Sequence, residues 1–454
     1  MTFHSNTFLK NCQITALISA SALLLVLIFL NLPVIISFIL AFFIGLIPFF
    51  LFRPISFLYF LFLVTPSLRI ISTNEIIFKN DYLAINFNAI INFSILFFGL
   101  ALLLTKWKEA VLFIKKYKFV ALFFAFIALA FLSAAYSVDR NSTLEEIIRI
   151  TGTFLLLLYG YLTVKDKKTF NFLIFAMLAG AAIPSLAGIF QHINGIGWWD
   201  KTIAVYRIQG TFLHPATFSF YLLFLLPVIY ALFQNEKNRF KKVAFSGLAA
   251  VFIFLIVASL TRGAWVGLLA MIIAFGIFIN RKVLIASAAI LFLAYLSVPA
   301  IQSRVNDVFD PKYNSSFSIR RKIVETTLPA FYNSPVYGYG FGSFSVIHDS
   351  YNEEAHTYES LQAHNDYLRV LIELGALGLA IFLSLYFFLY KTIRRELSST
   401  NNPVIKNYLL SLIILWAGVL AVSFGDNVLR TMEVQYLLWV YTGAVLGLKK
   451  ISSK

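Results

Sequence analysis

Long apolar runs separated by short polar breaks make up most of the chain. A helix that crosses a membrane needs about 20 apolar residues. Runs of that kind lie near residues 13–30, 33–52, 55–71, 85–104, 118–135, 147–164, 169–190, 215–233, 243–259, 264–280, 283–299, 366–390, 405–424 and 434–448. Prolines between residues 31 and 71 favour a tilted or re-entrant hairpin as the alternative there, which lowers the count from fourteen to twelve. The pattern predicts an all-α, polytopic integral membrane protein with 12 to 14 transmembrane helices, forming a single membrane domain over residues 1–454.

Composition and charge support this class and give an orientation. The chain is 60% hydrophobic, has a mean hydropathy of +0.82 and carries only 13% charged residues. Placing both termini in the cytoplasm puts 23 of the 37 basic residues on that side with only 4 of the 21 acidic ones, as the positive-inside rule requires. The net charge of +16 is therefore a topology signal. A basic soluble face for nucleic acid is absent from the sequence, so we expect no nucleic-acid partner.

Three polar breaks fall on the outer side in this orientation and are too elaborate for simple connectors. They are a Trp- and Gly-rich loop at 191–214, a tight bend at 259–265 and a long loop at 300–365. Long loops between packed elements are usually functional or disordered. Within the long loop, residues 318–333 have helical apolar spacing and residues 334–344 are rich in Gly and aromatic residues, which predicts an ordered loop with short helices.

A polar cluster stands directly before a predicted membrane helix in the segment AHNDYLRVLIELGALG, residues 363–378. Polar groups at membrane depth are costly and usually mark a substrate path. His364 is the candidate catalytic residue, because a neutral imidazole suits a general base near neutral pH. The alternative is that Asn365 or Asp366 caps the helix and His364 has no role.

Arginines accompany each outer break. Arg207 precedes a span, Arg262 lies in the bend, and Arg320 and Arg321 lie in the long loop. Arginine stays charged at membrane depth and binds phosphate oxygens bidentately, so these four are candidate diphosphate ligands. The alternatives are snorkelling for Arg207, a structural ion pair for Arg262 and solvated charges for the other two.

The remaining candidates are contacts to a sugar or acceptor: His214, Trp198, Asn365 and Asp366. His214 precedes a proline, so a role at a helix start is its alternative.

A metal site is not expected, because only His356 and Glu359 have helical ligand spacing and the lone Cys12 excludes a cysteine site. The sequence has no nucleotide-binding motif, and we expect no cofactor.

Four segments together resemble a known family. They are RIQGTFLHPATFSFYL (207–222), SLTRGAWVGLL (259–269), NSPVYGYGFGSF (333–344) and LQAHNDYLRVLIELGALGLAIFL (361–383). In this order and spacing they resemble the O-antigen ligase and O-antigen polymerase superfamily. Residues before 200 match only as generic apolar spans.

The resemblance implies a metal-independent glycosyltransferase of the bacterial inner membrane that acts at the periplasmic face, where the loops 191–214 and 300–365 would lie. Such an enzyme transfers a glycan from undecaprenyl diphosphate to an acceptor hydroxyl. The family's essential histidine maps onto His364, as the base, and its two arginines onto Arg207 and Arg262, as diphosphate ligands. The match at Arg320 and Arg321 is looser.

The acceptor separates the alternatives. A ligase uses a lipid A-core sugar, which is the function we expect, whereas a polymerase uses a second lipid-linked glycan. A transporter of lipid-linked glycans is the rival outside the enzyme class. It predicts polar residues on both membrane faces, whereas the candidate residues here fall on one.

Overall fold

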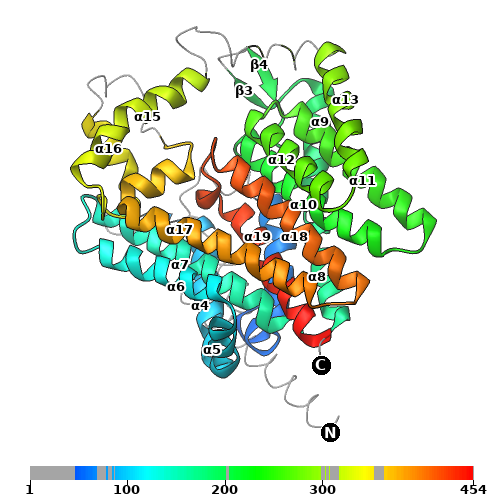
Figure 1. The fold of residues 1–454 in the computed structure, drawn as a ribbon, viewed down its shortest axis with the longest axis horizontal. Helices are drawn as coiled ribbons and strands as arrows, with labels where there is room; N and C mark the ends of the chain where they lie inside the picture. The colour runs from blue at the N-terminus through cyan, green and yellow to red at the C-terminus, as the bar shows by residue number, and fades with distance from the viewer. Residues whose placement is uncertain are drawn as a thin grey trace.

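The computed structural model describes residues 46–68, 78–79, 84–85, 87–200, 204–297, 302, 306, 316–351 and 362–452. These residues form a bundle of helices with two small antiparallel hairpins (Figure 1). The helices are α3 (Pro54–Leu68), α4 (Phe87–Thr105), α5 (Trp107–Lys116), α6 (Lys118–Ser133), α7 (Arg140–Thr163), α8 (Lys167–Ala179), α9 (Ala182–Asn194), α10 (Pro215–Asn235), α11 (Arg239–Ala258), α12 (Arg262–Phe278), α13 (Arg281–Ser297), α15 (Ser316–Asn333), α16 (Phe344–Tyr351), α17 (Asp366–Ser398), α18 (Pro403–Val422), the short 3-10 helix η1 (Val428–Arg430) and α19 (Met432–Ser452). The hairpins pair β1 (Phe78–Lys79) with β2 (Ala84–Ile85) and β3 (Trp198–Asp200) with β4 (Val205–Arg207).

Polar residues in the breaks start several of these helices. Asp166 accepts a hydrogen bond from the backbone N–H of Thr169 at 2.6 Å, before α8. Asn402 accepts one from Val404 at 3.0 Å, before α18. Such caps satisfy N–H groups that have no partner inside the helix. The polar breaks therefore fix helix starts as well as separating apolar runs.

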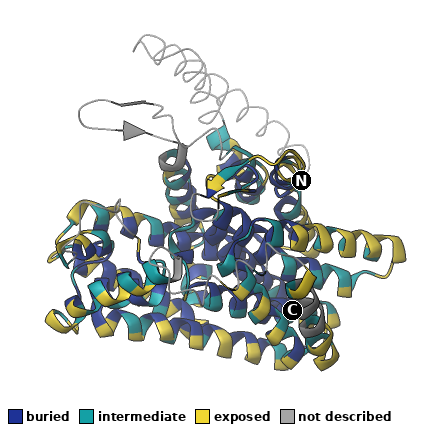
Figure 2. Ribbon diagram, turned by 90° about the horizontal axis from the view of Figure 1, so that it is seen from above, coloured by how far each residue is buried: buried dark blue, intermediate teal, exposed yellow. Residues whose placement is uncertain are grey.

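Helix α19 lies at the centre of the bundle and is buried from Met432 to Lys449. It packs closely against α7 because small residues face each other. A Cβ atom on Gly443 would overlap the carbonyl oxygen of Leu157, and one on Gly160 would overlap that of Val440. Between helices surrounded by lipid, close packing of this kind replaces the hydrophobic effect as the source of association. Figure 2 shows the buried interior and the exposed residues on the outer helices.

Six helical segments of the described chain are long and apolar enough to cross a membrane: α7, the pair α8 and α9, α10, α11, α17 and α18. The bent pair α4 and α5 is a seventh, and α3, α6 and α12 are shorter apolar helices. This pattern is that of a polytopic membrane protein. The expected span 13–30 and most of 33–52 lie outside the described residues, and the total of 12 to 14 spans stays a prediction.

The loops that were expected on the outer side gather at one end of the bundle. Helices α15 and α16 and the hairpin β3–β4 lie at this end, whereas α5 lies at the opposite end (Figure 1). Helix α15 covers residues 318–333, where apolar spacing predicted a helix. The hairpin was not predicted by the all-α interpretation; Gly195, at a φ of 61°, ends α9 and turns the chain into it.

Candidate functional site

His364 lies just outside the first turn of α17 and is not its cap. The side chain of Asn365 accepts hydrogen bonds from the backbone N–H groups of Tyr367 and Leu368, at 2.9 and 3.0 Å. His364 itself has a left-handed backbone, with a φ of 44°, a conformation that is strained for a residue with a side chain. Its ring is 38% exposed, and Nδ1 lies 3.6 Å from Oδ1 of Asp426. The capping and the candidate chemistry are thus divided between neighbouring residues.

Asp366 ties this region to the segment that joins α18 to α19. It is fully buried. Its backbone N–H donates to the carbonyl of Ser423 at 2.9 Å, and its carboxylate accepts from the N–H of Leu429 at 3.1 Å. Asp426 lies between these two anchor points. Asp366 therefore holds Asp426 beside His364 and does not itself face the exposed ring.

Asp426 was not among the predicted site residues, although Gly425 and Asn427 beside it mark a polar turn between the predicted spans 405–424 and 434–448. Burial raises the pKa of the Asp426 carboxyl, but the interactions with His364 and with the charge of Arg320 outweigh burial and lower that pKa below its usual value. The group is therefore an ionised carboxylate at neutral pH. An anion in this place favours the proton on Nδ1 of His364, which leaves Nε2 as the acceptor.

Arg320, on α15, interacts electrostatically with the same carboxylate. Burial lowers the pKa of its guanidinium, Asp426 raises it, and the positive charge of Arg262 lowers it further. Arg320 is therefore within electrostatic range of both Asp426 and Arg262. Its Nε is buried and makes no hydrogen bond to any described residue. The long outer loop thus brings one cation to the region of His364.

Arg321, the next residue, points elsewhere. Its side chain is 73% exposed, and Nε pairs with the carboxylate of Glu325 one turn along the surface of α15 at 2.7 Å. The structure separates the two neighbours that the sequence analysis treated alike.

Arg207, at the end of β4, is a buried residue and does not snorkel. Its Nε donates to the carbonyl of Ser259 at 2.9 Å, and a terminal nitrogen donates to the hydroxyl of Thr261 at 3.0 Å. The other terminal nitrogen pairs with Asp200 on β3 at 3.1 Å. The guanidinium also lies over the ring of Trp198, 5.6 Å from its centre. Arg207 therefore joins the hairpin to the bend at 259–261.

That bend delivers Arg262, the first residue of α12. Leu260 has a φ of 54°, so the chain turns sharply between α11 and α12. Arg262 is half-buried. By fixing the carbonyl of Ser259 and the hydroxyl of Thr261, Arg207 sets the position from which Arg262 starts.

His214 precedes α10 and lies beside Trp198. Its Nδ1 accepts from the backbone N–H of Ala216 at 3.2 Å and so caps α10, and its ring lies 5.1 Å from that of Trp198. Desolvation lowers the pKa of the imidazole, and the charges of Arg207 and His364 lower it as well, whereas Asp426 and Asp200 raise it. His214 is thus a helix cap within electrostatic range of both Arg207 and His364.

The segment 334–344 packs against a break in α17 and sets the direction of the first turns of that helix. The helix is broken at Gly375, with a φ of 66° and a ψ of −168°. The N–H groups after the break donate to the carbonyls of Pro335 and Val336 at 2.8 and 3.3 Å, and those of Tyr339 and Gly340 donate to the carbonyl of Glu373. A Cβ atom on Gly375 would overlap the carbonyl of Val336. The segment 334–344 and the Glu-Leu-Gly of α17 therefore form one joint.

Glu373 lies in a buried ion network beneath this joint. Its carboxylate accepts from Nε of Arg369 at 3.0 Å and from the N–H of Phe344 at 3.3 Å. Arg369 also pairs with Glu146 of α7 at 2.8 Å, and Glu146 pairs with Arg430 of η1 at 3.2 Å. The network links α7, α17 and the segment that carries Asp426, so it supports the site from below.

Over the described residues, no group of three His, Cys, Asp or Glu side chains is arranged to hold a metal ion. His356 and Glu359, the pair with helical ligand spacing, lie outside the described residues.

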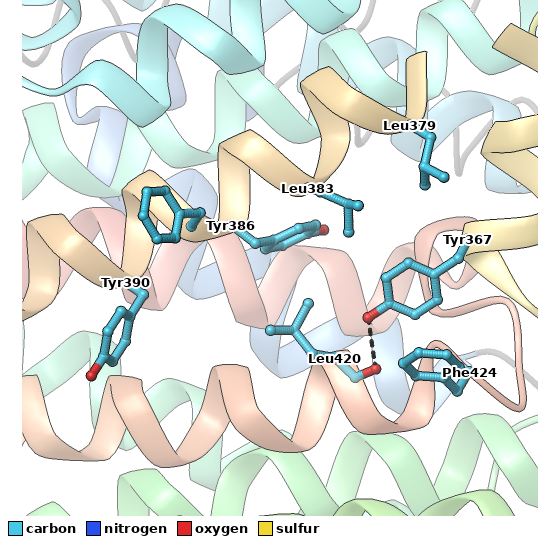
Figure 3. A pocket seen from close by; sticks show the side chains of 8 residues that line it. Tyr367, Leu379, Leu383, Tyr386, Tyr390, Leu420 and Phe424 are labelled. Atoms are coloured by element: carbon cyan, nitrogen blue, oxygen red, sulfur yellow. Dashed lines mark hydrogen bonds between the residues drawn. The ribbon is translucent and has the colours of Figure 1, made fainter. Parts of the chain in front are cut away.

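An apolar groove begins beside the site, between α17 and α18 (Figure 3). It has a volume of about 610 Å³ and is lined by Tyr367, Leu379, Leu383, Tyr386, Phe387, Tyr390, Leu420 and Phe424. One end of the groove is formed by Tyr367 and Phe424, which lie within three residues of His364 and Asp426, respectively, in the sequence. The hydroxyl of Tyr367 donates to the carbonyl of Leu420 at 2.9 Å (Figure 3). The groove follows α17 toward the opposite end of the bundle.

Comparison with known proteins gives two matches. Residues 247–383 match the sequence model of a family described as O-Antigen ligase. A protein of Salmonella typhimurium (strain LT2) named O-antigen ligase is 28% identical over 194 residues, which is 40% of this chain. The chain spans 46% of the length of that relative. The family match covers three of the four motif segments, and both matches support a relationship to the O-antigen ligase superfamily.

Proposed function

We propose that the protein is a glycosyltransferase of the O-antigen ligase type, which transfers a polysaccharide from undecaprenyl diphosphate to a sugar hydroxyl of the lipid A core at the periplasmic face of the bacterial inner membrane. The observation that carries the proposal is the convergence of five segments, far apart in the chain, at one end of the bundle. They supply Arg207, Arg262, Arg320, and the pair of His364 with Asp426.

In this proposal His364 is the general base. Nε2 accepts the proton of the acceptor hydroxyl while the hydroxyl oxygen forms a bond to the anomeric carbon of the glycan. The bond between that carbon and the phosphate oxygen breaks, and undecaprenyl diphosphate leaves with the electron pair. Asp426, 3.6 Å from Nδ1, stabilises the imidazolium that results.

Arginines stabilise the charge that develops on the diphosphate as it leaves. Arg262 and Arg320 are the direct candidates, because the charges of Arg262 and Asp426 both act on Arg320. Arg207 is held by Asp200, Ser259 and Thr261, so its first role is to position the bend before α12. Trp198, against the ring of His214, is the candidate for contact with a sugar.

The apolar groove supports a lipid-linked donor. Its lining is almost entirely hydrocarbon and aromatic, and it starts within a few residues of His364 and Asp426. A hydrocarbon chain that leaves the diphosphate would find an apolar path there without crossing a charged surface.

A polymerase would use the same residues with a second lipid-linked glycan as acceptor. The matched family and the Salmonella relative both bear the name ligase, which supports the ligase as the first candidate. A transporter is disfavoured because the candidate residues converge at one end only.

The test is replacement of His364 by Ala, with transfer from lipid-linked glycan to lipid A core measured in purified membranes. His192→Ala is the matched control, because His192 is an exposed histidine in the last turn of α9. We expect transfer to be abolished by the first change and retained after the second. Retention in His364→Ala would overturn the assignment of the base.

Deletion of the gene separates the two enzymes on a lipopolysaccharide gel. Glycan of normal chain length that is not joined to the core indicates a ligase. A core that carries a single repeat indicates a polymerase and would overturn the choice of acceptor.

A further inference from the structure

Helix α5 lies across one end of the bundle, opposite the site. The chain bends by 93° between the apolar helix α4 and α5, at Lys106. Figure 1 shows α5 at the far end from α15 and the hairpin β3–β4. Because α4 has the composition of a membrane span, a helix at a right angle to it would lie parallel to the plane of a membrane that α4 crosses upright.

The two faces of α5 differ in the way that an interfacial helix requires. Ala110 and Phe113 are fully buried, and the ring of Phe113 stacks on that of Tyr161 at 3.8 Å. Trp107 and Leu112 point outward and are 57% and 67% exposed. A helix with one face on the protein, and with Trp and Leu on the other beside lysines, is typical of a helix at the membrane interface.

Three segments far apart in the chain bring basic residues together around α5. Lys450 of α19 pairs with Glu109 of α5 at 3.1 Å, and Lys116 lies 3.8 Å from Glu396 of α17. The guanidinium of Arg395 lies 5.6 Å from the ring centre of Tyr117. The C-terminal ends of α17 and α19 therefore adjoin α5 and form one surface with it.

This surface, the basic end, comprises residues 106–118, 391–396 and 449–450. Ten basic residues stand against two acidic ones in these segments. Glu109 interacts with both Lys106 and Lys450, and Glu396 with Lys116 and Arg395. Both acidic groups are therefore shared between two cations. Lys449 is buried, but the other nine basic residues are at least partly exposed and leave a positive excess at the surface.

We propose that the basic end binds the phosphate head groups of anionic phospholipids, with α5 lying among the head groups and Trp107 and Leu112 at the edge of the hydrocarbon. The charge of the surface fits an anionic partner, and the exposed apolar side chains beside the lysines fit a lipid better than a soluble acidic protein. The proposal does not depend on the glycosyl transfer, which takes place at the other end. Lipid bound here contacts the inner end of α17, whose outer end carries His364.

The test compares two double variants of the full-length protein. Lys108→Gln with Lys115→Gln removes two exposed lysines of α5. Lys237→Gln with Lys241→Gln, the loop variant, removes two exposed lysines at the junction of α10 and α11, one in the loop and one in the first turn of α11. Each protein is purified in detergent and incubated with equal amounts of dioleoylphosphatidylglycerol and dioleoylphosphatidylcholine. Mass spectrometry then counts the lipids that remain bound.

Wild-type protein should retain phosphatidylglycerol in preference to phosphatidylcholine, and roughly 0.5 M salt should remove the preference. Each basic residue near an anionic surface raises the affinity for that surface about fivefold. The α5 variant should therefore retain less than half as much phosphatidylglycerol as the wild type. The loop variant should resemble the wild type.

Three results would overturn the proposal: no preference in the wild type, full retention by the α5 variant, or an equal loss in both variants. Size-exclusion chromatography identifies a variant that has lost its fold. The single variant Lys108→Gln then replaces it, with an expected loss of about fivefold in the phosphatidylglycerol preference.

Discussion

Replacement of Asp426 by Asn tests the assembly of the site most directly. The change keeps the size of the side chain and removes the charge that faces Nδ1 of His364. In the proposed reaction His364 gains a proton as the acceptor attacks, so Asp426 stabilises the transition state more than the resting enzyme. The variant should therefore show a lower kcat with a nearly unchanged KM for both substrates.

The structure gives the size of the effect. At 3.6 Å, Coulomb's law gives about 5 kcal/mol with an effective dielectric of about 20 and about 1 kcal/mol in bulk water. The His364 ring is 38% exposed and the Asp426 side chain 20% exposed, so the interaction lies between these limits, at about 3 kcal/mol. A loss of that size lowers kcat about 100-fold.

The assay is transfer of glycan from undecaprenyl diphosphate to lipid A core by purified protein in proteoliposomes, with kcat and KM measured separately. Asp349→Asn is the matched control. Asp349 lies 3.4 Å from Nδ1 of His348 on α16. It is a carboxylate at a similar distance from a histidine with no proposed role, and its replacement should leave kcat unchanged. If Asp426→Asn keeps the wild-type kcat, or if only KM changes, Asp426 does not assist the base and the reasoning fails.

Three further predictions follow from the structure. Arg320→Gln should lower transfer about tenfold or more because it removes a cation from the site, whereas Arg321→Gln should leave transfer unchanged because that side chain pairs with its own helix surface; equal effects in the transfer assay would contradict the separation of the two. Gly375→Ala should destabilise the protein by about 3 kcal/mol or more, because the backbone conformation of Gly375 is available essentially to glycine alone. The control is Gly247→Ala, where an added Cβ meets open space. Equal melting temperatures of the two variants in detergent would contradict the proposed requirement for glycine at position 375. The pKa of His214 is lowered in the folded protein, so the contribution of His214 to stability is full above about pH 6.5 and is lost as the pH falls through the folded pKa. His214→Asn keeps a cap on α10 and should reduce the drop in melting temperature between pH 7.5 and 5.5. An undiminished drop in the variant would exclude His214 as the source of the pH dependence.

The local pattern of apolar residues predicted the class of the protein and the positions of several helices. Apolar run length identified a polytopic membrane protein, and the helices α10, α11 and α18 follow the runs predicted for them within a few residues. Apolar spacing also marked the helix that became α15. These features are local, because the length of an apolar run and the period of its residues depend only on neighbours in the chain.

The internal arrangement of the site is a tertiary property. Asp426 lies 62 residues after His364 in the chain, and it comes close only because α17 and α18 run back along each other and Asp366 anchors the returning segment. The sequence does not distinguish the adjacent residues Arg320 and Arg321. The packing of α15 brings Arg320 within electrostatic range of Asp426 and leaves Arg321 at the surface, paired with Glu325.

The sequence by itself therefore determined the class of the protein, most helix positions and the identity of the residues that resemble a known family. The tertiary structure decided which of them face one another, that Asn365 caps the helix while His364 does not, and that Gly375 receives the loop 334–344. The physical reason is distance along the chain: helix formation and membrane partition are set within about 20 residues, whereas the pairing of charges 60 or more residues apart is set by how whole helices pack.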